Sequence, residues 1–426
     1  MSEFALMNRG ELQSRAARLD ERYLEFKAQR LALDMTRGKP CREQLDLSLG
    51  LLDCLGHADY RAADGTDCRN YGGLDGLPEA RALFADFLEV DPSEVIVGGN
   101  SSLTMMHDTV VQALLHGMPG GTGPWRALPS VKFLCPSPGY DRHFAICEHL
   151  GIDMLTVDMT SEGPDMEQVE HLVAADASIK GIWCVPKYSN PTGITFADTV
   201  VERLAHMHAA ALDFRIFWDN AYAVHHLSDR PDRLRNLLAA CKAAGNADRV
   251  LLFASLSKVS FAGGGVAVMA GSANNVRHIK SGMAIQTIGP DKLNQLRHVR
   301  FFRDIAGIEA HMRKHAAILR PKFAMVEEVL TRALDGTGVA QWSRPNGGYF
   351  ISLDTLDGCA KAVVAMAADA GVQLTQAGAT FPYGKDPRDR NIRIAPSMPS
   401  LDEIERAMEL VAVCIQRVGI ARLLER

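Results

Sequence analysis

Lys258 follows an apolar run at residues 250–253 that is typical of a buried strand. An unpaired ammonium group is costly to bury, so a lysine at the end of a core strand needs a chemical reason. One reason is that its amine forms a Schiff base with the aldehyde of pyridoxal 5'-phosphate, since Ser255 and Ser257 are the right size to hydrogen-bond the phosphate of that cofactor. The alternative is a surface lysine in an ordinary strand-to-loop turn, and this stretch by itself favours neither.

A second stretch with possible chemistry is the glycine turn at residues 98–102, between a predicted strand over 94–97 and a predicted helix that runs through Leu115. Free backbone N–H groups and the positive end of a helix dipole make such a turn an anion site. Similar turns also occur as plain helix caps. The turn therefore supports a phosphate site only if other residues require one.

The elements that position these groups alternate between strand and helix. Apolar runs predict further strands over 131–134, 181–186 and 214–218, with helical segments between them. This alternation predicts an α/β layer with a mostly parallel sheet, in which ligands bind at the carboxyl ends of the strands. The polar groups at or just after these ends are the Gly99–Ser102 turn, Tyr140, Asn190, Asp219, Tyr222 and Lys258. Their shared position predicts a single site.

Beyond residue 310 the pattern differs. A long helix is followed by a predicted strand over 342–351 and by a short predicted strand over 391–395 that carries Arg393. Ser400 and Glu403 have capping-box spacing at the start of a terminal helix. These features predict a smaller α+β domain.

The length of the chain allows two domains. We predict a large cofactor-binding domain over residues 56–310 and a small C-terminal domain over 311–426. The N-terminal segment 1–55, with an amphipathic helix predicted near 11–33, is expected to contribute to the small domain.

The bulk composition argues against several functions. Of the 426 residues, 47% are hydrophobic and 23% are charged, as in soluble globular proteins. The net charge of -5 gives no reason to expect a nucleic acid or a membrane as a partner, and no apolar run is long enough to span a bilayer. The start of the sequence lacks a secretory signal. Nine scattered cysteines without a C-x-x-C pair predict reduced thiols in a cytoplasm.

The sequence predicts no metal site. His311 and His315 have the spacing of a helical metal-binding pair, but no third ligand is near. Arg313 and Lys314 between them predict a solvated helix face instead.

Several short motifs occur along nearly the whole chain in a specific order. They are Tyr71-Gly, Gly99-Asn-Ser, Pro-Gly-Tyr140, Asn190-Pro-Thr-Gly, Asp219-x-x-Tyr222, Ser-x-Ser-Lys258, Gly-Gly-Tyr-Phe350 and Arg393. This set resembles the fold type I pyridoxal-phosphate enzymes, in their class I/II aminotransferase branch. Segments 36–40, 138–144 and 185–193 are most similar to the divergent bacterial aspartate aminotransferase subgroup. The resemblance implies a large domain with a mostly parallel, seven-stranded type of sheet between helices, plus a smaller α+β domain.

The resemblance implies a role for each residue around the cofactor ring. Lys258 would carry the Schiff base and, once released, would move the proton between Cα and C4'. Asp219 would pair with the pyridine nitrogen and keep it protonated. Tyr140 would stack on the ring, and Asn190 and Tyr222 would donate to the phenolate oxygen.

The resemblance also implies how the phosphate is held. The implied ligands are Gly99, Asn100, Ser101, Ser255, Ser257 and, from the other subunit of a homodimer, Tyr71. One position departs from the family: eight residues after the lysine, where relatives usually place a phosphate-binding arginine, this chain has Val266.

For the substrate, Arg393 is the implied ligand of the α-carboxylate, because a planar guanidinium binds a carboxylate through two hydrogen bonds. Asn190 and the backbone of Gly38 are expected to assist. Arg37 and Lys39 are candidates, by charge and position only, to bind a side-chain carboxylate.

These roles predict an aminotransferase that moves the amino group of an L-amino acid, most specifically aspartate, to a 2-oxo acid, most specifically 2-oxoglutarate. A C–S β-lyase and an aromatic or kynurenine aminotransferase stay open as alternatives, because the fold does not decide the reaction type. A DNA-binding regulator built on this scaffold is disfavoured, since few residues precede Thr36 and the chain is acidic.

Overall fold

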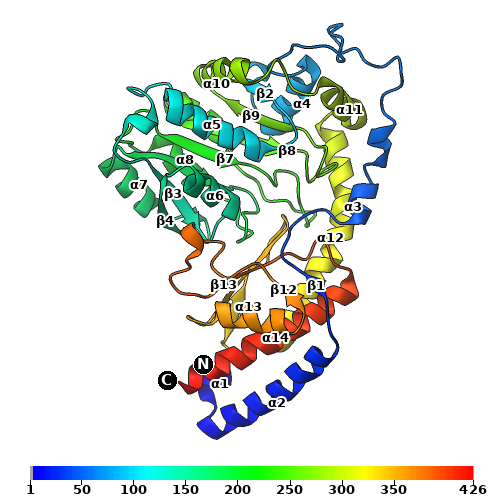
Figure 1. Cartoon of the computed structure of the whole chain (residues 1–426), viewed down its shortest axis with the longest axis vertical. Coiled ribbons are helices and arrows are strands. Elements are labelled where there is room, and N and C mark those ends of the chain that lie inside the picture. Colours follow the sequence, from blue (N-terminus) through cyan, green and yellow to red (C-terminus); the bar gives the residue numbers. More distant parts are fainter. Residues whose placement is uncertain (1–2, 426) are drawn as a thin grey trace.

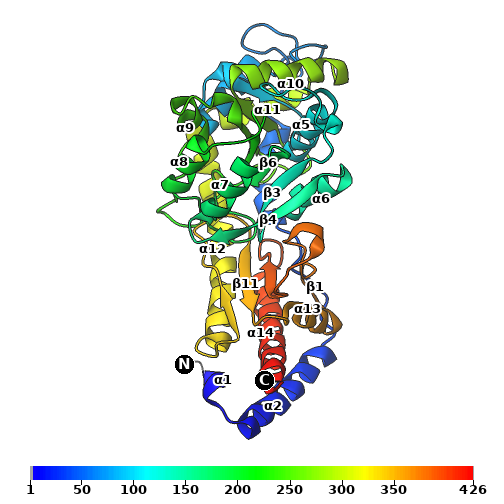
Figure 2. The same ribbon diagram turned by 90° about the vertical axis from the view of Figure 1, so that its left-hand side faces the viewer.

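The computed structural model describes residues 3–425 of the chain. Figure 1 shows two lobes: an upper one built around a large sheet, and a lower one that contains α2 (Arg9–Ala28), α13 (Ala360–Asp369) and α14 (Leu401–Leu424). α12 (Ile305–Leu334) extends from the upper lobe into the lower one, as the side view in Figure 2 also shows. Within the described residues, no helix combines the length and the apolar character needed to cross a membrane.

The large sheet has eight strands in the order β2-β9-β8-β7-β6-β3-β4-β5. Five of them, β3, β4, β6, β7 and β8, are parallel; β9 is antiparallel to both of its neighbours, and β5 is antiparallel to β4. The predicted α/β fold with a mostly parallel sheet is confirmed, with the two-residue β5 added at one edge. The strands are β2 (Val95–Val97), β3 (Lys132–Ser137), β4 (Asp153–Thr160), β5 (Gly163–Pro164), β6 (Ile179–Cys184), β7 (Arg215–Asp219), β8 (Val250–Ser255) and β9 (Ala267–Gly271).

The central strands are apolar because both faces of the sheet are covered. In β7, Ile216 and Trp218 belong to the hydrophobic core on one face, and Phe217 between them belongs to the core on the other face. This follows from the alternation of side chains along a strand. The helices of the upper lobe are α4 (Pro78–Leu88), α5 (Ser102–His116), α6 (Asp141–His149), α7 (Met166–Ala175), α8 (Asp198–His206), α9 (Leu237–Ala243), α10 (Ala273–Gln286) and α11 (Lys292–Phe302).

The lower lobe contains two small sheets. Its hydrophobic core also takes in Val185, Tyr188, Tyr222 and Leu227, which follow strands β6 and β7 of the upper lobe. β10 (Ala340–Trp342), β11 (Ile351–Thr355) and β13 (Asn391–Ile394) form an antiparallel sheet. β1 (Leu33–Asp34) pairs in parallel with β12 (Val372–Gln373), which joins the N-terminal segment to the C-terminal part of the chain. The remaining elements are α1 (Glu3–Leu6), α3 (Arg42–Asp46) and 3₁₀ turns at Leu49–Leu52, Pro92–Glu94, Trp125–Ala127, Ala247–Arg249 and Pro382–Gly384.

The predicted strand over 342–351 is wrong. β10 ends at Trp342 and β11 begins at Ile351, and a loop joins them. Pro345 has no N–H to give to a sheet ladder. A side chain at Gly347 would place its Cβ only 2.4 Å from the His225 carbonyl oxygen, so this loop packs directly against the turn that follows β7.

The N-terminal helix is shorter than the predicted 11–33. It is capped by Asn8 and Glu11 and ends at Ala28, because Arg30 has a left-handed φ of 51°. At the other end of the chain, the predicted capping box of the terminal helix is confirmed. The domain boundaries at 55 and 310 remain predictions, and α12 runs across the second of them.

Candidate active site

Lys258 lies in the turn between β8 and β9, three residues beyond the end of β8. Its amine is 5.1 Å from the centre of the Tyr222 ring. Burial lowers the pKa of Lys258 below its ordinary value, and the negative charge of Asp219 opposes that change. A lysine with a lowered pKa is more often a neutral amine, which is the form that attacks an aldehyde.

Asp219 is the last residue of β7 and is buried. Its Oδ2 accepts a hydrogen bond of 3.0 Å from Nε2 of His143, whose ring stacks on Trp183 at 4.5 Å. Its other oxygen, Oδ1, is buried and has no hydrogen-bond partner among residues 3–425. An unsatisfied buried carboxylate oxygen is costly, so this atom indicates a donor that the chain does not supply. The protonated ring nitrogen of pyridoxal 5'-phosphate fits that requirement.

His143 is a site residue that the sequence reasoning missed. It lies in the quoted 138–144 motif, but its contact with Asp219 depends on the pairing of β3 and β6, which brings α6 to the end of β7. No local pattern distinguishes it from the other histidines of the chain.

Two tyrosines flank the same region. Tyr140 precedes α6, and its ring meets that of His143 edge-on at 4.9 Å. Tyr222 is buried and packs on Tyr349 at 6.1 Å between ring centres. Burial raises the pKa of both Tyr140 and Tyr222, with a smaller contribution from Asp219, so each keeps its hydroxyl proton. Both therefore remain hydrogen-bond donors.

The glycine turn and the lysine turn are tied together. Ser257 donates a hydrogen bond of 2.8 Å from its hydroxyl to the Asn100 carbonyl oxygen. Ser101 caps α5 through the N–H of Thr104, and Gly99 is exposed beside it. The structure thus places the N-terminus of a 15-residue helix next to the turn that carries Lys258. This is the arrangement expected of a phosphate site.

The described residues that line the cavity at the Gly99–Ser101 turn supply no replacement for the phosphate-binding arginine expected at position 266. Val266 is buried, and its carbonyl oxygen accepts a hydrogen bond from the Leu256 N–H. A cavity of about 670 Å³ adjoins the Gly99–Ser101 turn, and no lysine or arginine is among the described residues that line it. Ser255 closes β8 and is half-buried. Hydroxyl groups and backbone N–H groups are therefore the available phosphate ligands.

Arg393 points into the site from β13 and is buried. Its Nη1 donates to Asp141 Oδ1 at 2.8 Å and to Asn190 Oδ1 at 3.3 Å, and its Nη2 donates to Thr375 Oγ1 at 3.4 Å. Its Nε is buried without a partner in the described part of the chain. Nη2 and Nε are thus the two donors least engaged by the protein, as the binding of a carboxylate requires.

Gly38 and Arg393 both pack against the ring of Phe350. A Cβ at Gly38 would lie 2.5 Å from the Phe350 ring, and Arg393 stacks over the same ring at 4.9 Å. Arg37 and Lys39 on either side of Gly38 are exposed, and their side chains form no ion pair within residues 3–425. The described residues therefore do not neutralise either cation through an ion pair.

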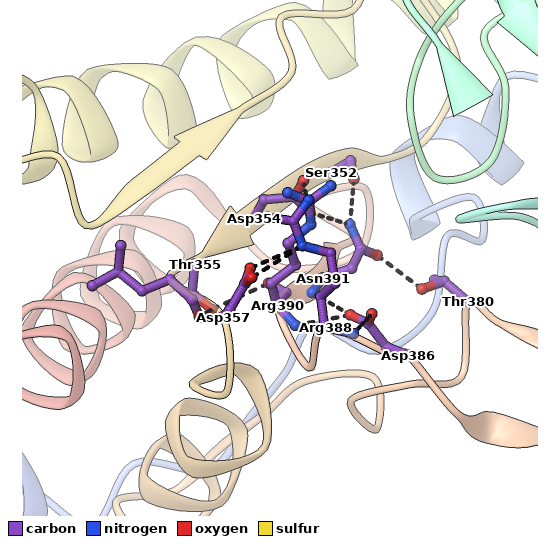
Figure 3. A network of polar contacts seen from close by, with 10 residues as sticks. Ser352, Asp354, Thr355, Asp357, Thr380, Asp386, Arg388, Arg390 and Asn391 are labelled. Atoms are coloured by element: carbon purple, nitrogen blue, oxygen red, sulfur yellow. Dashed lines mark hydrogen bonds and ion pairs between the residues drawn. The ribbon is translucent and has the colours of Figure 1, made fainter. Parts of the chain in front are cut away.

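A polar network holds the strand that carries Arg393 (Figure 3). Asn391 is buried, and its side chain accepts from Thr380 Oγ1 at 2.8 Å and donates to Ser352 Oγ and Asp354 Oδ1 at 2.9 and 2.8 Å. The carbonyl oxygen of Thr380 in turn accepts a hydrogen bond of 2.8 Å from the backbone N–H of Gly139, the residue before Tyr140. The network therefore links β13 to the loop that holds Tyr140 and Asp141.

Tyr71 is a predicted site residue whose side chain the structure leaves exposed. Its side chain is 82% exposed and makes no hydrogen bond within the described residues.

Comparisons with known proteins identify the family. The sequence model of the family described as "Aspartate amino-transferase" matches residues 7–426. An aspartate aminotransferase of Corynebacterium glutamicum is 47% identical over 397 residues, which cover 93% of this chain and 92% of the relative. The crystal structure of an aspartate transaminase from Corynebacterium glutamicum has a TM-score of 0.97 at 44% identity, and the match covers 99% of each chain.

A more distant crystal structure shares the fold at 19% identity. It is an α-aminoadipate aminotransferase from Thermus thermophilus complexed with N-(5'-phosphopyridoxyl)-L-leucine, with a TM-score of 0.74 over 95% of each chain. The chain described here therefore belongs to the aspartate aminotransferase family and is an aminotransferase of fold type I.

Proposed function

We propose that this enzyme transfers the amino group of L-aspartate to 2-oxoglutarate, with pyridoxal 5'-phosphate bound to Lys258. The observation that supports the cofactor best is the unpartnered Oδ1 of Asp219, a buried acceptor close enough to Lys258 to affect its pKa. The aspartate aminotransferase named among its relatives supports the substrate, and the phosphopyridoxyl compound in the more distant structure supports the cofactor.

The residues of this chain divide the work between them. When bound, the cofactor supplies an electron sink for the bond broken at the substrate Cα. Lys258 takes up and returns the proton at that carbon, a role for which its lowered pKa suits it. Asp219 holds a proton on the ring nitrogen through charge, and His143 fixes the orientation of its carboxylate. Tyr140, whose ring meets that of His143, would stack on the cofactor ring.

The substrate is oriented by its carboxylates. Arg393 binds the α-carboxylate through Nη2 and Nε, with Asn190 beside it. Arg37 and Lys39 are the proposed partners of the side-chain carboxylate of aspartate, because both are exposed and lie beside Gly38.

Replacing Arg393 by alanine is expected to raise KM for both substrates by about 10- to 100-fold, since two charge-assisted hydrogen bonds contribute about 1.5–3 kcal/mol. Steady-state kinetics measure this, with Arg388→Ala as a matched control. Arg388 lies in the loop that leads into β13 but binds the exposed Asp357, so its loss leaves KM unchanged. An unaltered KM in Arg393→Ala would remove this residue from the substrate site.

The enzyme is proposed to be a homodimer. Around the cavity beside the glycine turn, Ile285 is 90% exposed, and nearby Ile288 is 63% exposed. A second copy would cover these side chains and bring its Tyr71 to the phosphate. Sedimentation is expected to give the mass of two chains; a fully active monomer contradicts the proposal.

A mixing experiment tests the shared site directly. If Tyr71 serves the opposite subunit, hybrids of Lys258→Ala and Tyr71→Ala chains contain one intact site, and activity rises well above that of either parent. If Tyr71 serves its own subunit, both sites of the hybrid are defective and no activity is gained. The second result rejects the shared site.

The reaction itself is tested by one half-reaction. Mixing cofactor-loaded enzyme with L-aspartate alone is expected to release one oxaloacetate per site and to bleach the visible absorbance, which 2-oxoglutarate restores. A loaded enzyme that L-aspartate does not bleach, but that releases ammonia and pyruvate continuously from L-cystathionine, whose β-carbon carries a sulfur leaving group, would indicate β-elimination and contradict the proposal. Faster bleaching with kynurenine or aromatic amino acids than with aspartate would transfer the assignment to those substrates. A cytoplasmic location, proposed from the scattered cysteines, completes the assignment.

A further inference from the structure

Three buried histidines hold the three residues that begin with Lys258. His225 Nε2 lies 3.4 Å from the carbonyl oxygen of Lys258 itself. His311 Nε2 lies 3.0 Å from the carbonyl oxygen of Val259, the next residue. His298 Nε2 lies 2.8 Å from the hydroxyl oxygen of Ser260, the residue after that. They come from the turn after β7, from α12 and from α11. Consecutive residues of one turn are thus each held by a histidine from a different element.

These contacts define the hydrogen-bonding state of the rings. A carbonyl oxygen can only accept, so His225 donates from Nε2. His311 donates to the Val259 carbonyl oxygen when its proton is on Nε2, the nitrogen that the Ser48 hydroxyl and His315 Nε2 also approach at 3.1 Å. Nδ1 of His225 is buried and has no partner among the described residues, which suits a bare nitrogen in a neutral ring. In His298, Nδ1 donates to the Asn294 carbonyl oxygen at 2.8 Å, so Nε2 is an acceptor facing the Ser260 hydroxyl at 2.8 Å. The single proton of that hydroxyl is shared between this nitrogen and the Leu256 carbonyl oxygen at 3.0 Å.

The rings are neutral at physiological pH. Burial lowers the pKa of His298 to about 4 and also lowers the pKa of His225 and His311. A cation near Lys258 would disfavour the protonated form of its amine. Neutral imidazoles instead hold the turn through hydrogen bonds without adding charge, which an arginine or lysine at these positions could not do.

The solvated helix face predicted from Arg313 and Lys314 is wrong for His311 and His315. Both histidines are buried, and their Nε2 atoms are 3.1 Å apart. The N-terminal segment braces the pair: Ser48 lies 3.1 Å from His311, and Gln44 lies 2.9 Å from His315. The proposed small-domain segment therefore contacts the histidine pair that lies against the Lys258 turn.

We propose that His311, together with His225 and His298, positions the Lys258 amine, so that these three histidines are positioning residues of the active site. The inference rests on the proposed role of Lys258. None of the three is expected to touch substrate, because each contacts the backbone or the Ser260 hydroxyl rather than the lysine side chain.

The test compares two replacements at position 311. His311→Phe keeps the ring but removes the N–H, whereas His311→Gln keeps a donor near the place of Nε2. The readout on cofactor-free protein is the pH dependence of Lys258 labelling by an amine-reactive reagent, followed by peptide mass spectrometry. His311→Phe is expected to move the labelling midpoint by about one pH unit and to lower kcat by about 10- to 100-fold with KM little changed. His311→Gln restores both toward wild type, and His206→Gln, on the exposed face of α8, matches wild type in both.

Ser260→Ala is a second, smaller change that removes the partner of His298. It is expected to move the same midpoint in the same direction by less. The proposal is overturned if Lys258 in folded His311→Phe is labelled with the wild-type pH profile and this variant keeps the wild-type kcat. If His311→Phe does not fold, the same result in Ser260→Ala overturns the proposal. Protection of wild-type Lys258 from labelling by added pyridoxal 5'-phosphate tests the proposed function separately. If the cofactor does not protect Lys258, the proposed function is wrong. The labelling profiles of the cofactor-free variants still test the positioning role in that case.

Discussion

Lys258→Ala is expected to lose the covalent link to the cofactor and at least about 10²- to 10⁴-fold in kcat, the range supplied by a positioned proton-transfer group alone. The reason is that, among residues 3–425, Lys258 is the amine that lies beyond the end of β8, beside Tyr222 and within the field of Asp219. Visible absorbance of the loaded protein and the rate with aspartate measure the two losses. The visible band and the activity with aspartate are expected to disappear together.

Lys187 provides the matched control. Burial lowers its pKa to about 8, so it is also a lysine with a perturbed amine, but its Nζ donates to the Ala223 carbonyl oxygen at 3.0 Å. Lys187→Ala is expected to keep the visible band and most of the rate. A visible band that survives in Lys258→Ala and vanishes in Lys187→Ala would show that Lys187 carries the cofactor. That result would contradict the assignment to Lys258.

Asp219→Asn is expected to reduce kcat by about 10²- to 10³-fold, comparable to the loss of one preorganised group that stabilises developing charge. Asparagine has nearly the same shape and can still contact His143, but it carries no negative charge to keep the ring nitrogen protonated. Cofactor binding, measured by titration of the visible band, is expected to weaken far less than the rate.

Asp213→Asn separates this effect from a general loss of a buried charge. Asp213 is equally buried in the upper lobe, where it binds Trp125 Nε1 at 2.7 Å and Lys180 Nζ at 2.6 Å. Its replacement is expected to lower the melting temperature while the folded enzyme keeps its kcat. If Asp219→Asn behaves like Asp213→Asn, its carboxylate has a structural role only.

Much of the site was predictable because it depends on a simple rule of α/β sheets. Asp219 and Lys258 follow apolar runs that had to be central strands, and parallel strands end at the same edge. The partners of these residues were not predictable in the same way. His143, Asp141 and Thr375 meet Asp219 and Arg393 only through the packing of elements far apart in sequence.

The errors have local causes. The two charged residues between His311 and His315 were taken to mark the face of the whole segment, but residues four apart share one side of a helix and those between them point elsewhere. The Gly-Gly segment before Phe350 does lead into a strand, but β11 begins only at Ile351 because this segment packs against the turn after β7. Tyr71 could be placed only by resemblance, because its predicted contact belongs to another copy of the chain.

The central claim is that one particular amine carries the cofactor. The most direct measurement is reduction of the pyridoxal-phosphate-loaded protein with borohydride, followed by peptide mass spectrometry. We expect a single phosphopyridoxyl adduct, on Lys258. An adduct on Lys187 or another lysine, or no adduct at all, would contradict the account.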